Sequence, residues 1–330
     1  MTTTGLGIMM RAALLALALA HGAPAAAADL QVVASIKPIH SLVAGVMQGA
    51  GAPTLLVEGA GSPHSYSLRP SKARALAEAD LVFWVGPGLE TFLIKPLTTL
   101  PASARLVALS EAEGVRLLPT RAGGTWQDHA EEEEEEEAHA EADADHADHA
   151  DHAPGAADLH VWLDPVNAAA MVGAIAAALS AADPERGALY AANAAALRTE
   201  LERLNRDLAE RLAPVRTQPF VVFHDAYRYF EDRYGLNAVG AISVSPERRP
   251  GARRLSAIRD RLAQLEAACV FAEPQFEPAL VDTVVEGTSA RRGVLDPMGA
   301  ALEDGPQQYF ELMKGLADAL LACLGAADRE

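Results

Sequence analysis

The sequence predicts an α/β protein made of two lobes, each with a four-stranded, mainly parallel sheet, joined by a long rigid helix. Short apolar runs alternate with helical stretches over most of the chain, a pattern typical of repeated strand–helix–strand units. An uninterrupted helical stretch, 184–213, separates two such series. Because 30 helical residues span about 45 Å, this stretch suits a connector between lobes. Ligands of such sheets bind at the carboxyl ends of the strands, so we expect the site in the cleft between the lobes.

The first 28 residues have the pattern of an export signal. Arg11 precedes the apolar run 12–20, and small residues lead to Ala28. The run is too short to span a bilayer comfortably, and we identify no other long apolar run. We therefore expect cleavage after about Ala28 and a free, exported protein that does not insert into the membrane.

The N-terminal lobe is expected to cover residues 29–183, including a disordered loop at 128–157. Its strands are predicted at 30–36, 54–58, 81–85 and 105–109. Its helices are predicted at 38–47, 70–79, 90–100 and 166–182. The connecting helix begins at Asp183-Pro184, with Asp as the capping residue and Pro in the first turn.

The C-terminal lobe is expected to cover residues 214–330 and to repeat the same alternation. Its strands are predicted at 220–223, 238–244, 269–272 and 293–295. Its helices are predicted at 227–234, 252–267, 278–286 and 307–324. The two halves are alike in architecture, although we find no sequence repeat between them.

The loop 128–157 differs in composition from the rest of the chain. It contains seven consecutive glutamates, and its histidines are His129, His139, His146, His149 and His152. It has too few large apolar residues to offset the entropy of ordering. Acidic residues with histidines favour metal binding, so we hypothesise that the loop binds additional zinc weakly. The alternative is a solvated acidic loop without a binding role.

The acidic residues of this loop account for most of the charge imbalance. The formal net charge is −18, and 13 acidic residues lie between Asp128 and Asp151. This charge disfavours nucleic acid as a partner and favours cations.

Four residues outside the loop could form a metal site between the lobes. His64 lies in the loop after the second strand, His224 and Asp296 each end a strand, and His160 follows the acidic loop. Three imidazoles with one carboxylate suit a tetrahedral zinc centre. A single histidine at a strand end is more often structural, and Asp-Pro is also common turn chemistry.

Five sequence blocks resemble the ZnuA-type periplasmic zinc-binding proteins of ABC importers. They occur in the family's order over nearly the whole mature chain, at 62–70, 79–86, 159–167, 223–227 and 295–299. The resemblance implies zinc capture in the periplasm and delivery to an ABC permease. It also implies that His64, His160 and His224 bind Zn²⁺, with a carboxylate or water as fourth ligand. Asp296 matches the carboxylate position used in the wider family.

The resemblance bears on the disulfide and on metal preference as well. The two cysteines are compatible with one disulfide or with two buried thiols, and export favours the disulfide. Cys269 and Cys323 fall where many zinc members of the family carry a disulfide. Manganese-specific relatives typically have a carboxylate at the position of His224. Three imidazoles favour zinc over manganese, although copper and nickel also bind imidazole strongly.

Other residues have two interpretations each. His40 follows a strand and better suits a structural role at a helix start than a role in the site. Asp225, Glu273 and Arg69 could orient the imidazoles or form a salt-bridge network without a metal role.

Two other functions are alternatives to metal capture. An exported zinc hydrolase needs an open coordination position, which Asp296 would fill. The chain also has no H-E-x-x-H motif, so we do not expect an enzyme. A metal-binding adhesin or buffer without a transporter is the second alternative.

Overall fold

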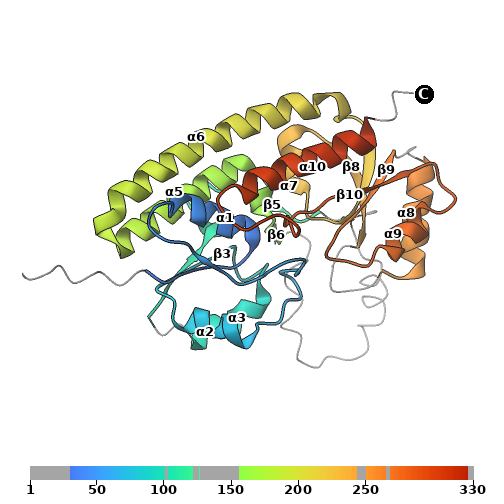
Figure 1. The fold of residues 1–330 in the computed structure, drawn as a ribbon. Helices are drawn as coiled ribbons and strands as arrows, with labels where there is room; N and C mark the ends of the chain where they lie inside the picture. Colours follow the sequence, from blue (N-terminus) through green and yellow to red (C-terminus); the bar gives the residue numbers. More distant parts are fainter. Residues whose placement is uncertain are drawn as a thin grey trace, which may run out of the picture.

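The computed structural model describes residues 30–100, 103–121, 126, 156–243, 250–264 and 268–325 (Figure 1). The predicted signal, residues 1–28, lies outside the described residues. The five loop histidines also lie outside them: His129, His139, His146, His149 and His152.

The N-terminal sheet has four parallel strands in the order β2-β1-β3-β4. The strands are β1 (Val32–Ala34), β2 (Thr54–Leu55), β3 (Leu81–Trp84) and β4 (Arg105–Ala108). The helices that follow them are α1 (Lys37–Val46), α2 (Pro70–Ala77) and α3 (Thr91–Thr99). Apolar residues of α2 and α3 pack on one face of the sheet, and α1 packs on the other face.

The C-terminal sheet also has four parallel strands, in the order β10-β9-β7-β8. The strands are β7 (Pro219–His224), β8 (Asn237–Ser243), β9 (Cys269–Ala272) and β10 (Arg291–Val294). The helices are α7 (Arg228–Tyr234), α8 (Ala252–Gln264), α9 (Ala279–Val285) and α10 (Gln308–Leu324). Helices α8 and α9 cover one face, whereas α10 lies on the other. The predicted two-sheet α/β fold is therefore confirmed.

Helices α5 (Pro165–Ala182) and α6 (Gly187–Leu212) lie side by side, and α6 runs along the top of the molecule in Figure 1. The expected helix 184–213 differs at its ends, because 3₁₀ turns at Pro184–Arg186 and Ala213–Val215 flank α6. The Asp183 carboxylate accepts a hydrogen bond from the backbone N–H of Arg186, which caps the first of these turns. Helix α6 packs against α1 and also against α10, so it connects the two sheets.

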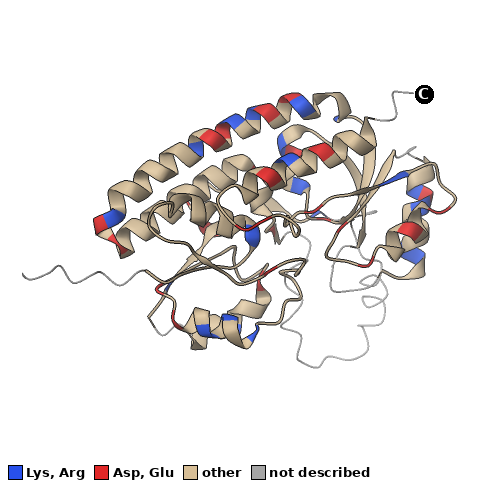
Figure 2. Ribbon diagram, viewed as in Figure 1, with Lys and Arg blue, Asp and Glu red and all other residues tan. Residues whose placement is uncertain are grey.

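Helix α5, which the sequence predicts at 166–182, is strongly apolar. Its 18 residues include no charged side chain, and they are long and apolar enough to cross a membrane by length and composition (Figure 2). Half of this segment is buried, and it packs against α6 and β3. We therefore interpret α5 as a core helix. The expectation that the chain has no further long apolar run was wrong.

A small antiparallel sheet was not predicted. Strand β5 (Leu118–Pro119) pairs with β6 (Ala157–Asp158), on either side of the acidic loop. Two residues per strand are too few to show a period in the sequence. This pair brings the end of the loop back to the sheets just before His160.

The lobes share their main hydrophobic core. One cluster of buried residues includes Phe83 from β3, Leu204 from α6 and Phe271 from β9. Helix α10, assigned to the C-terminal lobe by sequence, packs against α1 of the N-terminal lobe. The division into 29–183, 184–213 and 214–330 stays a prediction.

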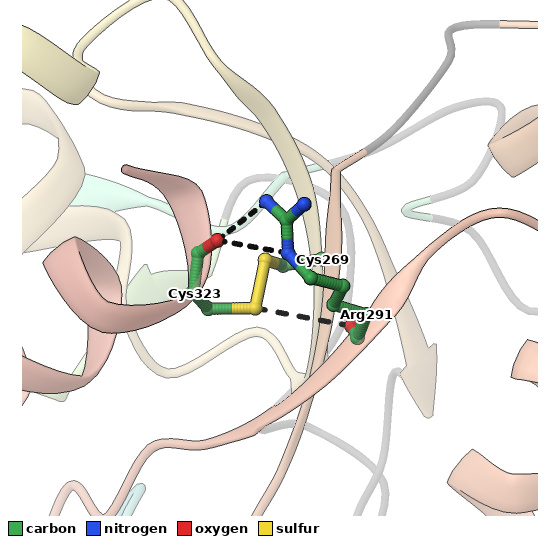
Figure 3. Close-up of a disulfide and its surroundings, with 3 residues drawn as sticks. All are labelled: Cys269, Arg291 and Cys323. Carbon is green, nitrogen blue, oxygen red and sulfur yellow. Dashed lines mark hydrogen bonds between the residues drawn. A yellow bond between two sulfur atoms is a disulfide. The ribbon is translucent and has the colours of Figure 1, made fainter. Parts of the chain in front are cut away.

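Cys269 and Cys323 form a disulfide, as predicted (Figure 3). It ties β9 to the last turn of α10 across 54 positions of sequence. The guanidinium of Arg291 donates to the carbonyl oxygen of Cys323 from Nε at 3.1 Å and from Nη2 at 2.6 Å. A cation at this place stabilises the free carbonyls at a helix C-terminus.

Candidate metal centre

Three histidines from separate elements come together between the sheets. His64 lies in the loop after β2, His160 follows β6, and His224 is the last residue of β7. The Nε2 atoms of His64 and His160 are 3.3 Å apart, and the potential ligand atoms of all three residues lie within 4.8 Å of one another. A cation between them would meet three imidazole nitrogens.

Two buried carboxylates hold two of these rings. Asp158 Oδ1 accepts from Nδ1 of His160 at 2.8 Å and from the backbone N–H of His160 at 2.9 Å. Glu273 Oε1 accepts from Nδ1 of His224 at 2.7 Å and from the backbone N–H of His224 at 3.2 Å. A carboxylate on Nδ1 fixes the tautomer in which Nε2 has a free lone pair for a metal.

The charge around His224 favours a positive group. Burial disfavours its imidazolium form, but the carboxylates of Glu273, Asp225 and Asp158 together outweigh burial and raise the pKa of His224. Tyr227 is also buried, and burial together with the charge of Glu273 raises the pKa of its phenol well above the usual range. The phenol therefore stays neutral beside the carboxylate.

Asp296 is not brought into the histidine cluster. Its Oδ1 accepts from the backbone N–H groups of Met298 at 3.1 Å and Gly299 at 2.9 Å, and from Nε2 of Gln275 at 2.8 Å. Its Oδ2 accepts from the backbone N–H of Ala300 at 2.6 Å. As a metal ligand Asp296 would have to give up some of these bonds, so this assignment stays a prediction.

The remaining candidates have other partners. Asp225 pairs with Arg121, which also binds Glu231 on α7 with Nη1–Oε2 at 2.8 Å. Arg69 is exposed and lies 4.0 Å from Glu58. Of the three residues considered for orienting imidazoles, only Glu273 bonds to one in the described structure.

His40 lies outside the cluster. It is buried in α1, and its Nε2 lies 3.1 Å from the carbonyl oxygen of Pro53. Its predicted structural role fits this contact.

Sequence reasoning missed Asp158 and Arg121. The spacing Asp-x-His at 158–160 could have indicated Asp158, since a carboxylate two residues before a histidine can reach its Nδ1. Nothing near Arg121 in the sequence indicated that it would pair with Asp225 and Glu231. Its guanidinium lies over the Trp126 ring, 3.6 Å from the centroid, next to the start of the acidic loop.

Cavities lie on two sides of the histidine cluster. One is lined by polar and charged groups that include Arg121, Asp158 and Asp225. The other has more apolar walls, with Trp162 and Phe276 among them. The three histidines thus line both cavities, one with charged groups in its walls and one with mostly apolar walls.

Two α/β lobes with parallel sheets, and three imidazoles between them, are the features of a solute-binding protein for metal ions. The profile of the family described as "ZnuA: Zinc-uptake complex component A periplasmic" matches residues 32–323, and the chain belongs to this family. Membership identifies the chain as a periplasmic binding component and not an enzyme, which confirms both expectations.

The individual relatives agree with the family. The chain is 52% identical over 304 residues to "High-affinity zinc uptake system protein ZnuA" of Brucella abortus (strain 2308), covering 89% of this chain and 91% of the relative. It is 42% identical over 325 residues to the protein of the same name from Paracoccus denitrificans (strain Pd 1222), covering 96% and 100%. The solved structure titled "Crystal structure of ZnuA" matches with a TM-score of 0.72 and 25% identity, covering 89% and 98%.

Proposed function

We propose that this chain captures zinc in the periplasm with His64, His160 and His224 and delivers it to the permease of an ABC importer. One observation carries the assignment of ligands. The three imidazoles converge, and buried carboxylates on Nδ1 turn the Nε2 atoms of His160 and His224 toward the cluster. Three nitrogen ligands favour a borderline cation such as Zn²⁺ over oxygen-preferring cations.

A water molecule is our preferred fourth ligand. Asp296 is the alternative, at the cost of breaking hydrogen bonds to its own loop. An X-ray absorption spectrum of the zinc-loaded protein tests the three imidazoles, which contribute nitrogen scatterers at about 2.0 Å whichever oxygen completes the site. A spectrum with fewer than three imidazoles would contradict the proposed site.

Alanine variants of the three histidines test the ligand set. We expect each of His64→Ala, His160→Ala and His224→Ala to weaken zinc binding by about 100-fold or more in competition titrations with a chelator. His40→Gln is the matched control, because His40 is a buried histidine outside the cluster. Equal losses in His40→Gln and in the three alanine variants would argue against the assignment.

Delivery to a permease is supported by the family description, which names a component of a zinc-uptake complex. We propose that the binding protein acts as a monomer, without nucleic acid and without inserting into the membrane. Zinc uptake by cells that lack the gene, restored by the wild-type chain but not by His224→Ala, tests this role. Full uptake without the chain would contradict it.

The loop histidines belong to a separate proposal, because they lie outside the described residues. We propose that His129, His139, His146, His149 and His152 bind additional zinc weakly. Deletion of 128–152 should then lower the zinc stoichiometry while leaving one tight site. An unchanged stoichiometry would contradict this role.

A further inference from the structure

The segment 296–304, between β10 and α10, is where the C-terminal lobe meets the start of α1 (Figure 1). The carbonyl oxygen of Pro297 accepts from Nε1 of Trp162 at 2.9 Å. Pro297 and Met298 line the more apolar cavity beside the three histidines. This segment is therefore a wall of the proposed zinc site.

Lys37 fastens this wall from the N-terminal lobe. It is the first residue of α1, and only 5% of its side chain is exposed. Its Nζ lies 2.6 Å from the carbonyl oxygen of Leu302, 3.5 Å from that of Ala300 and 2.9 Å from Oδ1 of Asp304. A buried ammonium is stable only when its donors are satisfied, and all three of these acceptors belong to the segment 296–304.

Asp296 holds the same segment from within the C-terminal lobe. Its carboxylate accepts from three consecutive backbone N–H groups, at Met298, Gly299 and Ala300. Gly299 has φ +66°, and a Cβ there would lie 2.4 Å from Nε2 of Gln308, so the turn requires glycine. The fourth bond to Asp296 comes from Gln275, two residues after the histidine-binding Glu273.

We propose that Lys37 and Asp296 are positioning residues of an interlobe clasp, the segment 296–304 with these two side chains, which slows the release of bound zinc. The inference rests on the proposed function. The wall at Pro297 and Met298 cannot move away from the histidines while both side chains hold the segment. A stronger clasp therefore means a slower release of zinc.

Replacing Lys37 tests the clasp. In stopped-flow experiments with excess chelator, we expect Lys37→Met to release zinc about tenfold faster or more than the wild type, since it loses several charge-assisted hydrogen bonds. Lys72→Met is the matched control, because Lys72 pairs with Glu58 within the N-terminal lobe. Lys37→Arg should restore part of the slow release. Wild-type release from a folded Lys37→Met protein would overturn the proposal.

Replacing Asp296 separates a positioning role from a ligand role. Asp296→Asn keeps one acceptor oxygen but loses the bond from Ala300, so release should become faster. With Co²⁺ in place of zinc, the Asp296→Asn variant should have the same visible absorption spectrum as the wild type. The effects of Lys37→Met and Asp296→Asn should not add, because both loosen the same segment. A changed Co²⁺ spectrum would make Asp296 a ligand and remove it from the clasp.

The experiments distinguish a failure of the proposed function from a failure of the clasp. If the wild-type chain binds no zinc through its three histidines, the proposed function is wrong. If it does bind zinc but the Lys37 and Asp296 variants release it at the wild-type rate, only the clasp is wrong.

Discussion

At the scale of single residues, the carboxylates behind the histidines distinguish this cluster from imidazoles that meet by chance. Asp158 and Glu273 are nearly fully buried, and each bonds both the ring and the backbone of its histidine. Burying a carboxylate costs free energy unless it is hydrogen-bonded or near a positive charge. A cation among the rings would supply that charge, so the pairs favour the metal-loaded state.

Replacing Glu273 by glutamine should separate charge from geometry. The amide oxygen can still accept from Nδ1 of His224, but the negative charge behind the ring is lost. We expect zinc affinity to fall by about 10- to 100-fold in a chelator competition titration. Glu286→Gln serves as the control, since Glu286 is an exposed glutamate of the same lobe. A Glu273→Gln protein with wild-type affinity would show that the charge has no role.

At the scale of elements, the sequence predicted every strand of the two main sheets and every helix that follows them, because each lies in a short apolar run or a helical stretch that is visible in the sequence. The segments that position the site are different. Strands β5 and β6 are two residues each, and the segment 296–304 has no period at all. Their structure depends on partners distant in sequence, such as Lys37 for the segment 296–304 and Tyr229, whose hydroxyl donates to the carbonyl oxygen of Asp158 at 2.5 Å.

The disulfide between β9 and α10 should contribute about 4 kcal/mol to the free energy of unfolding by the chain-entropy model for 54 positions. The double variant Cys269→Ser and Cys323→Ser should show this loss in chemical denaturation. Its zinc affinity should stay close to that of the wild type, because the bond lies at the far end of α10 from the histidines. A large loss of affinity in a folded double variant would contradict this division of roles.

The turn after β3 should give the protein a pH-dependent stability. Glu90 is fully buried, and its carboxylate accepts from the hydroxyl of Ser35 and from the backbone N–H groups of Val85 and Gly86. Burial outweighs these bonds and raises the pKa of Glu90 from 4.5 to about 7.

The sign of the effect follows from proton uptake. Between pH 4.5 and 7 the folded state binds more protons at Glu90 than the unfolded state does, so the contribution of Glu90 to stability is full below pH 4.5 and is lost as pH rises through 7. The expected loss is about 3 kcal/mol. In urea titrations at several pH values, Glu90→Gln should become more stable relative to the wild type as pH rises. A difference that does not change with pH would contradict the raised pKa.

At the scale of the whole molecule, the sequence predicted the site from strand ends and from the resemblance to a known family. His64 and His224 lie at or beyond the carboxyl ends of strands in different sheets, which predicts a meeting between the lobes. The position of Asp296 satisfies the same rule, yet its carboxylate turns back to its own loop. Which way a strand-end side chain points depends on local hydrogen bonds that periodicity does not contain.

The shared core also predicts how the whole protein responds to zinc. Hinged binding proteins close by rotating lobes about flexible strands, and such motion needs an interface that can open. Here the main core runs through both lobes, and α6 packs against a helix of each. Arg233 of α7 adds a link to Asp164 at the start of α5, with Nη2–Oδ2 at 2.6 Å.

We therefore expect the radius of gyration in X-ray scattering to be the same with and without zinc, within experimental error. The chain without residues 128–152 is the appropriate sample, because it isolates the motion of the lobes from any response of the acidic loop. Removing the link with Arg233→Met should leave this result unchanged, since the shared core alone resists hinge opening. A clear compaction of the loop-deleted chain on adding zinc would show that the lobes rotate in spite of their common core.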